Sequence, residues 1–428
     1  MMINRREFLS KSALALTSFF LPLEKLANAA SKDEVIWSGV YYGVPTPDVP
    51  RLLNAVSQGI EASGGLSVLQ KKCFGLLAST YGAENVVNGV LEKQEVETSS
   101  LYFMLTFDFE QFLDVPDIAG GASDKMLGII FNSIKVVQLS LGDEDVRGRF
   151  KVKYTIPFYT KFIGDRVPHK TAVKNMLYDS AGSGLSIVDY YANKINGLGF
   201  KEIFCTEDME GCGQAPLNFR VSKVNIQKKA VLALEELGIS KYLSESFIGN
   251  SLASALSMKT SAITSPFGST YAFSSYDGFP SIFFERDKVA AITDAALSAE
   301  NDDAYELEVT LIKVIRKKTQ SSKTRRGYKR ILVFGVKVFD GYWDRKQIFK
   351  TAIAIDASGW VPTSLIKKGR VKELEAKAFS ELTITVFEKL FDGVSNSSWD
   401  TLGSIGMKKD KTEKMVNDLR VAISKSVP

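Results

Sequence analysis

Apolar positions along the chain follow two spacings, one typical of strands and one typical of helices. Runs in which branched and aromatic residues alternate with polar ones predict strands, and apolar residues recurring every three or four positions predict helices. In the first half the predicted strands are residues 35–42, 101–112, 134–141 and 150–162, the last two forming a hairpin around an acidic turn at 142–148. The predicted helices are residues 50–77, broken at Gly64 and Gly65, and residues 171–196.

The second half repeats this order. Helical spacing covers residues 225–237 and 242–258, and a Gly/Ser/Pro-rich stretch follows at 261–280. Strand patterns then occupy residues 305–316, 328–339 and 347–356, before helical spacing resumes at 371–390. Each half therefore offers an antiparallel β-meander followed by a helix, although the two halves do not align residue by residue.

This order predicts an α+β fold of two domains, each an antiparallel β-meander with helices packed on one face. We place the domains at residues 30–220 and 221–428, after an N-terminal segment of residues 1–29. Whether the halves arose by duplication stays open at this stage.

The first 29 residues have the pattern of a bacterial signal peptide. A pair of arginines precedes a modest apolar run at residues 13–23, and small residues follow at the expected cleavage position. The residues that carry the pattern are Arg5, Arg6, Phe8 and Leu9 in the motif and Ala27 and Ala29 at the cleavage site.

The motif resembles the twin-arginine family of signal peptides. Ser10 stands where that family usually has lysine, and Lys11 follows one place late. The resemblance implies that the protein crosses the inner membrane already folded and works in the periplasm. The apolar run of the signal is shorter than the roughly 20 residues of a stable span, so we expect no transmembrane span in the mature chain.

Composition indicates a well-packed and mildly basic protein. Hydrophobic residues make up 45% of the chain and charged residues 24%, as in ordinary globular domains. The formal net charge is +5 for all 428 residues. Removal of residues 1–29 takes away four basic and two acidic side chains, which leaves +3.

Three cysteines enter a compartment that permits disulfides. Cys205 and Cys212 flank a short acidic segment next to two glycines, and we predict that they form a structural disulfide. A redox-active or metal-binding pair is the rival interpretation, but the spacing is not Cys-x-x-Cys and no second pair exists. Cys73 lies among apolar residues and is expected to be a buried free thiol.

The single histidine, His169, narrows the catalytic possibilities. Histidine-rich metal sites need more than one histidine, and no glycine-rich nucleotide loop is present. Acidic residues cluster at Asp302, Asp303, Glu306 and Glu308, where a solvated turn is a simpler explanation than a cation site. We therefore predict no catalytic residue, no metal site and no cofactor.

The strongest functional feature is electrostatic. Between residues 309 and 339 there is no acidic residue, while ten are basic, most of them near the tip of a predicted hairpin. The residues that we assign to binding an anionic partner are Lys317, Lys318, Lys323, Arg325, Arg326, Lys329 and Arg330. Anionic lipid, glycolipid or an acidic envelope protein fits this charge, and nucleic acid does not fit the compartment. Basic residues that protect a sheet edge from aggregation are an equal alternative.

The sequence thus predicts a non-catalytic assembly, scaffold or binding protein of the bacterial cell envelope. One alternative is an exported enzyme, either a carboxylate-based hydrolase or a cofactor-dependent oxidoreductase, acting on an envelope glycan or lipid. A second alternative is a small-ligand binding protein.

Overall fold

The structure is a computed structural model. It describes residues 35–43, 52–88, 101–116, 124–140, 149–179, 185–198, 218–237, 239, 241–265, 267, 304–341 and 345–427. Residues 34–428 form one compact unit. The predicted signal residues Arg5, Arg6, Phe8, Leu9, Ala27 and Ala29, and the predicted disulfide between Cys205 and Cys212, lie outside the described residues.

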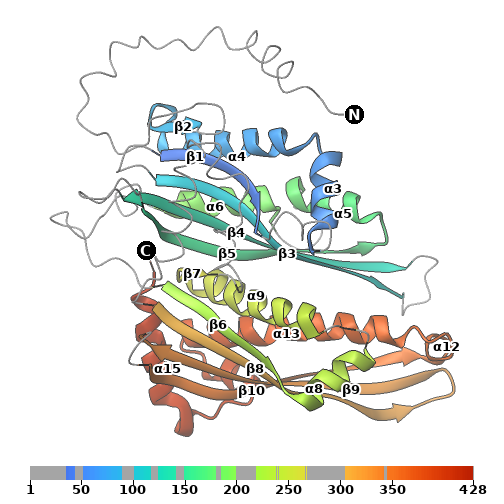
Figure 1. Ribbon diagram of the computed structural model, residues 1–428. Coiled ribbons are helices and arrows are strands. Elements are labelled where there is room, and N and C mark those ends of the chain that lie inside the picture. The colour runs from blue at the N-terminus through green and yellow to red at the C-terminus, as the bar shows by residue number, and fades with distance from the viewer. Residues whose placement is uncertain are drawn as a thin grey trace, which may run out of the picture. The chain divides into compact units, whose positions relative to one another are not determined.

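The first sheet has five strands in the order β2-β1-β3-β4-β5 (Figure 1). The strands are β1 (Val35–Tyr42), β2 (Val86–Asn88), β3 (Leu101–Val115), β4 (Lys125–Ser140) and β5 (Arg149–Asp165). The last three form the predicted antiparallel meander, whereas β1 pairs in parallel with both β2 and β3. Helices α3 (Asn54–Ala62), α4 (Leu66–Tyr81), α5 (His169–Tyr178) and α6 (Ile187–Gly197) pack on one face.

The second sheet has the order β10-β9-β8-β6-β7. Its strands are β6 (Asn218–Ile226), β7 (Thr264–Ser265), β8 (Ala304–Ser321), β9 (Arg325–Asp340) and β10 (Lys346–Pro362). Its helices are α8 (Lys228–Glu236), α9 (Lys241–Thr260), α12 (Thr363–Lys367), α13 (Val371–Ser395), α14 (Trp399–Ser404) and α15 (Lys409–Ser424). The α+β prediction with a meander and packed helices in each half is confirmed.

The two sheets have the same topology and the same register. In each, the first strand of the half pairs in parallel with a short strand and with the first strand of the meander. The pair Val35–Leu101 in the first sheet corresponds to Phe219–Tyr305 in the second. The halves are therefore structural repeats of each other.

Three irregularities in strand pairing fall at equivalent positions of the two sheets. The register between the parallel strands shifts between Trp37 and Gly39 in β1 and between Val221 and Lys223 in β6. The meanders shift between Phe107 and Phe109 and between Leu311 and Lys313, and again at Val136/Val137 and at Gln347/Phe349. Bulges are specific features of a fold. Because three of them occur at matching positions, residues of the two sheets can be matched one to one and their side chains compared.

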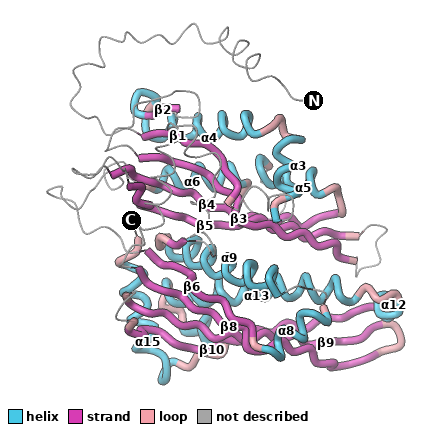
Figure 2. The backbone as a smooth tube through the Cα atoms, viewed as in Figure 1, coloured by secondary structure: helices cyan, strands magenta, loops and turns pink. Residues whose placement is uncertain are grey.

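Helices α9 and α13 lie between the sheets (Figure 2). On the side of the first sheet, the ring of Phe131 meets that of Phe247 at 5.5 Å, edge to face. On the side of the second sheet, the ring of Phe334 lies 5.0 Å from that of Phe387. One hydrophobic cluster therefore contains residues of both halves.

Polar contacts join the halves at the same place. The hydroxyl of Ser380 on α13 donates to the side-chain oxygen of Gln111 at 2.7 Å. The Tyr159 hydroxyl on β5 donates to the carboxylate of Glu388. Each half thus covers its own sheet with helices on one face, and the second half's helices also cover the other face of the first sheet.

Candidate anion-binding hairpin

The turn between β8 and β9 is fixed by hydrogen bonds of small polar residues. The backbone N–H of Arg325 donates to the Ser322 hydroxyl at 3.0 Å, and that of Ser322 donates to the Arg325 carbonyl at 2.8 Å. The N–H of Thr363, at the start of α12, donates to the Thr324 carbonyl at 2.8 Å. The turn is therefore attached to the end of β10, and its basic side chains project from a braced backbone.

Five of the seven predicted anion-binding residues lie at this tip. Lys317, Lys318, Lys323 and Arg325 are exposed, and Arg326 is half-buried. Within the described part of the chain, none of these five forms an ion pair with a carboxylate. Their charges are therefore open to an external anion.

The other two predicted residues serve the protein itself. The Lys329 ammonium lies 3.0 Å from the Asp356 carboxylate on β10. Arg330 points toward the helices and makes two hydrogen bonds of 2.7 Å with Glu375 on α13. Lys317 and Lys329 lie directly opposite each other, so this register position separates the tip, whose basic residues have no described carboxylate partner, from the root, where Lys329 and Arg330 are ion-paired.

Glu375 is the centre of a buried charge cluster at the root. Its side chain is 4% exposed, and a second arginine, Arg316, places its Nε 3.3 Å from the same carboxylate. The Arg316 guanidinium also stacks 3.9 Å from the centroid of the Tyr328 ring. Two arginines on neighbouring strands are therefore joined to one helix, which fixes the direction of the hairpin relative to α13.

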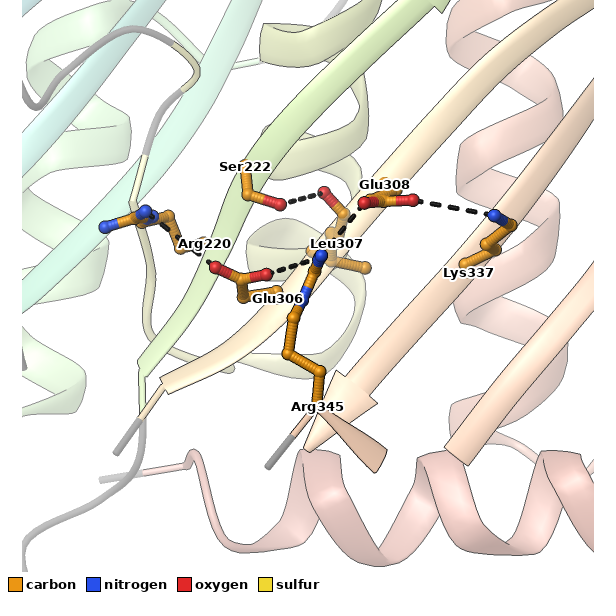
Figure 3. A network of polar contacts seen from close by, with 7 residues as sticks. All are labelled: Arg220, Ser222, Glu306, Leu307, Glu308, Lys337 and Arg345. Atoms are coloured by element: carbon orange, nitrogen blue, oxygen red, sulfur yellow. Dashed lines mark hydrogen bonds and ion pairs between the residues drawn. The ribbon is translucent and has the colours of Figure 1, made fainter. Parts of the chain in front are cut away.

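The acidic residues of β8 are likewise neutralised (Figure 3). Arg345 approaches Glu306 at 2.6 Å and Glu308 at 3.0 Å. Arg220 lies 3.8 Å from Glu306, and Lys337 lies 3.7 Å from Glu308. Glu306 lies within β8 and is buried between these cations, so it is not the solvated turn residue that we expected. Asp302 and Asp303 lie outside the described residues.

Sequence reasoning missed part of the basic surface. Lys367, the last residue of α12, and Lys368, directly after it, are exposed, and α12 is attached to the turn through Thr363. Their run with Arg370 is visible in the sequence, but nothing there shows that α12 meets the hairpin tip. Trp360 on β10 was also missed, and its side chain is 44% exposed.

A cavity of about 680 Å³ is lined by residues of α3, β3, α5, α9 and α13, and ligands bind in concave sites of this size in many proteins. Three carboxylates line it. Glu110 accepts the N–H groups of Ala55 and Val56 at 2.9 and 2.7 Å, which caps α3, and burial raises the pKa of Glu110. Glu373 pairs with Arg370 at 2.9 Å. Asp114 pairs through Oδ2 with Arg166 at 2.9 Å, whereas its buried Oδ1 has no hydrogen-bond partner among the described residues.

His169 and Cys73 lie in different surroundings. His169 is exposed, begins α5, stacks on Phe112 with ring centroids 4.8 Å apart and lines the cavity described above. Cys73 is a free thiol with no exposed surface, as predicted, and burial raises its pKa to about 12. In the described residues, no group of three potential metal ligands comes together. None of the helices that the structure describes is both long and apolar enough to span a bilayer.

Comparison with known proteins gives little guidance. No family model and no curated protein matches the chain. Among solved structures, it is similar to a minor lipoprotein from Acinetobacter baumannii, with 9% sequence identity and a TM-score of 0.20. The match covers 42% of this chain and 93% of that one. A likeness at this level carries no argument about function.

Proposed function

We propose that this is an exported, non-catalytic binding or scaffold protein of the bacterial cell envelope, and that the β8–β9 hairpin contacts an anionic partner there. The observation that supports the proposal is the contrast within one hairpin. Glu306 and Glu308 at the start of β8, and Glu375 on α13 beside the hairpin, are neutralised internally, whereas the five cations at its tip have no described carboxylate partner. Export and the periplasmic location follow from the signal-peptide prediction.

The expected binding strength follows from the number of free charges. A basic residue close to an anionic membrane surface contributes about 1 kcal/mol, so four or five at one tip supply binding without a shaped pocket. Such binding weakens with salt, because the screening length shrinks from about 10 Å at 0.1 M to about 3 Å at 1 M.

The test is a tip variant that carries Lys317→Ser, Lys318→Ser, Lys323→Ser and Arg325→Ser. We expect the mature wild-type protein to bind phosphatidylglycerol vesicles and immobilised polyglutamate at low salt, and the tip variant to lose most of both. Cosedimentation and retention volume measure the two effects.

A matched control removes four exposed charges elsewhere, Lys228, Lys229, Lys408 and Lys411, also by serine. If the control and the tip variant weaken binding equally, net charge rather than the hairpin is responsible and the proposal fails. It also fails if wild-type protein binds neither probe.

A further inference from the structure

The repeat raises a question about the face of the second sheet that points away from α9 and α13, here called the outer face. Alternation along β9 places Leu332 and Phe334 in the core and Ile331 and Val333 on the outer face. The equivalent face of the first sheet is not open. It is covered by α9 and α13, through contacts such as those of Phe131 with Phe247.

The centre of the outer face keeps the apolar character of its covered counterpart. Register equates Ile331 with Ile129 and Val333 with Phe131. Ile315 pairs directly with Ile331 and is 38% exposed. On the neighbouring strand, Ala354 lies opposite Val333 and Asp356 lies opposite Ile331. Trp360, which is 44% exposed, lies nearer the hairpin tip, opposite Gly327. Ile315, Ile331 and Val333 are neighbours on β8 and β9 and form a contiguous apolar patch at the centre of this face, and contiguous exposed apolar patches mark interaction sites.

The margins of the outer face are more basic than those of the equivalent face of the first sheet. Lysines replace apolar residues at three equivalent positions: Lys313 stands for Phe109, Lys317 for Leu113 and Lys329 for Leu127. Asp356 compensates Lys329, and within the described part of the chain neither Lys313 nor Lys317 pairs with a carboxylate. An occupant of this face must therefore be apolar in the middle and acidic at the side.

We propose that the outer face binds an amphipathic helix of a protein partner, with carboxylates along its margin, in the way that the first sheet binds α9 and α13. The inference rests on the proposed function only in sharing an anionic partner. A helix is the occupant because the equivalent face, with the same strands and bulges, is covered by helices, and because a sheet and a helix bury matching apolar surfaces.

A second copy of this chain fits poorly. Head-to-tail stacking would place α4 and α5 of the next copy on the outer face. Those helices carry exposed Lys71, Lys72, Lys170 and Lys174, and the outer face itself carries Lys313 and Lys317, so both surfaces are basic. Like charges at an interface oppose association.

The test places a photoreactive residue on the outer face in cells that make the full-length protein, by Ile315→p-benzoylphenylalanine. A control carries the same group at Leu232 on α8, which is 53% exposed. After irradiation, adducts are isolated and the crosslinked peptide is sequenced by mass spectrometry. We expect a peptide from another protein with helical apolar spacing and flanking Asp or Glu, from Ile315 and not from Leu232.

Charge reversal tests the recognition. Lys313→Glu with Lys317→Glu should reduce the yield of that adduct at least tenfold, whereas Lys408→Glu with Lys411→Glu should leave it unchanged. Adducts with lipid, with a second copy of the chain or with no partner would overturn the inference.

The two proposals fail separately. Lipid adducts together with loss of vesicle binding in the tip variant would keep the anion-binding function and remove the helix-binding face. In the opposite case, wild-type protein binds neither anionic probe, and the crosslink to a helical peptide persists in the serine variants Lys318→Ser, Lys323→Ser and Arg325→Ser. That result would support helix binding by the outer face and contradict anion binding by the hairpin.

Discussion

Replacing Glu375 by glutamine should destabilise the protein far more than any exposed charge change. Glu375 is 4% exposed and accepts two hydrogen bonds of 2.7 Å from Arg330, whose side chain is 13% exposed. Removing one partner of a buried ion pair leaves an uncompensated charge and costs about 3–5 kcal/mol. Because Arg316 is 37% exposed and can turn to solvent, we expect the lower end of that range for Glu375→Gln.

Urea unfolding followed by far-ultraviolet circular dichroism measures the free energy of unfolding. The matched control is Glu373→Gln, two residues earlier on α13. Glu373 is 39% exposed, and its partner Arg370 also pairs with Asp124 at 3.0 Å. Exposed pairs contribute about 0–1 kcal/mol, so the control should stay within that range with an unchanged slope against urea.

A double-mutant cycle isolates the Glu375–Arg330 pair. Arg330→Gln combined with Glu375→Gln should cost less than the sum of the single changes, because neither charge is then left alone. If Glu375→Gln costs no more than Glu373→Gln, or if the cycle is additive, the buried cluster does not hold the hairpin root, and Arg330 returns to the set of residues free to bind an anion.

Three further outcomes follow from residues described above. Tyr159→Phe removes a hydrogen bond to the Glu388 carboxylate and should cost about 1.5–3 kcal/mol. Burial and Glu388 raise the pKa of Tyr159 in the folded protein, so its contribution to stability is complete below the unfolded pKa of about 10 and is lost as pH rises above that value. Between pH 8 and pH 10.5, the free energy of unfolding in urea should therefore fall less in the variant than in the wild type. An equal fall in both proteins would contradict this. Cys73 should resist iodoacetamide at pH 8 until urea unfolds the protein, as mass spectrometry can follow, and rapid native labelling would mean that its pocket opens. Arg5→Lys with Arg6→Lys should leave precursor in the cytoplasm on immunoblots of cell fractions, whereas normal maturation would point to the general secretion route.

The long meanders and the alternation of element types were predictable from sequence. Strand β6 was not, and residues from 225 onward were assigned to a helix. Phe219 and Val221 face the core, then the bulge at Ser222 changes the phase so that Val224 and Ile226 face it instead. A bulge removes the period of two on which strand prediction depends. The helix begins only at Lys228.

The repeat was suspected from element order but could not be aligned from residues. The strand register of the two sheets shows why the sequences do not align. Few side chains coincide, among them Ser38 with Ser222, Thr106 with Thr310 and Lys135 with Lys337. Equivalent faces also meet different surroundings, since one is covered by α9 and α13 and none of the described helices covers the other. Hydrophobicity therefore diverges at the positions that an alignment would use.

The sequence predicted the basic residues of the hairpin as one group, but it did not predict which of them form internal ion pairs. Nothing in the spacing of Lys329 and Arg330 distinguishes them from Arg325 and Arg326. Their roles depend on which face of β9 each occupies and on Asp356 and Glu375, which come from β10 and α13. Such partners are distant in the chain and are visible only once the sheet is assembled.

The position of α9 and α13 between the sheets has a consequence for biosynthesis. A ribosome releases the first sheet before either helix exists, so the side of that sheet carrying Phe131 is bare until the rest of the chain emerges. The parallel partner of β1 also arrives late, since Val35 pairs with Leu101, and distant pairings of this kind fold slowly. We therefore expect nascent chains to need chaperones until α9 and α13 have been synthesised. Export in the folded state, which the signal-peptide prediction implies, would let this assembly finish in the compartment of synthesis.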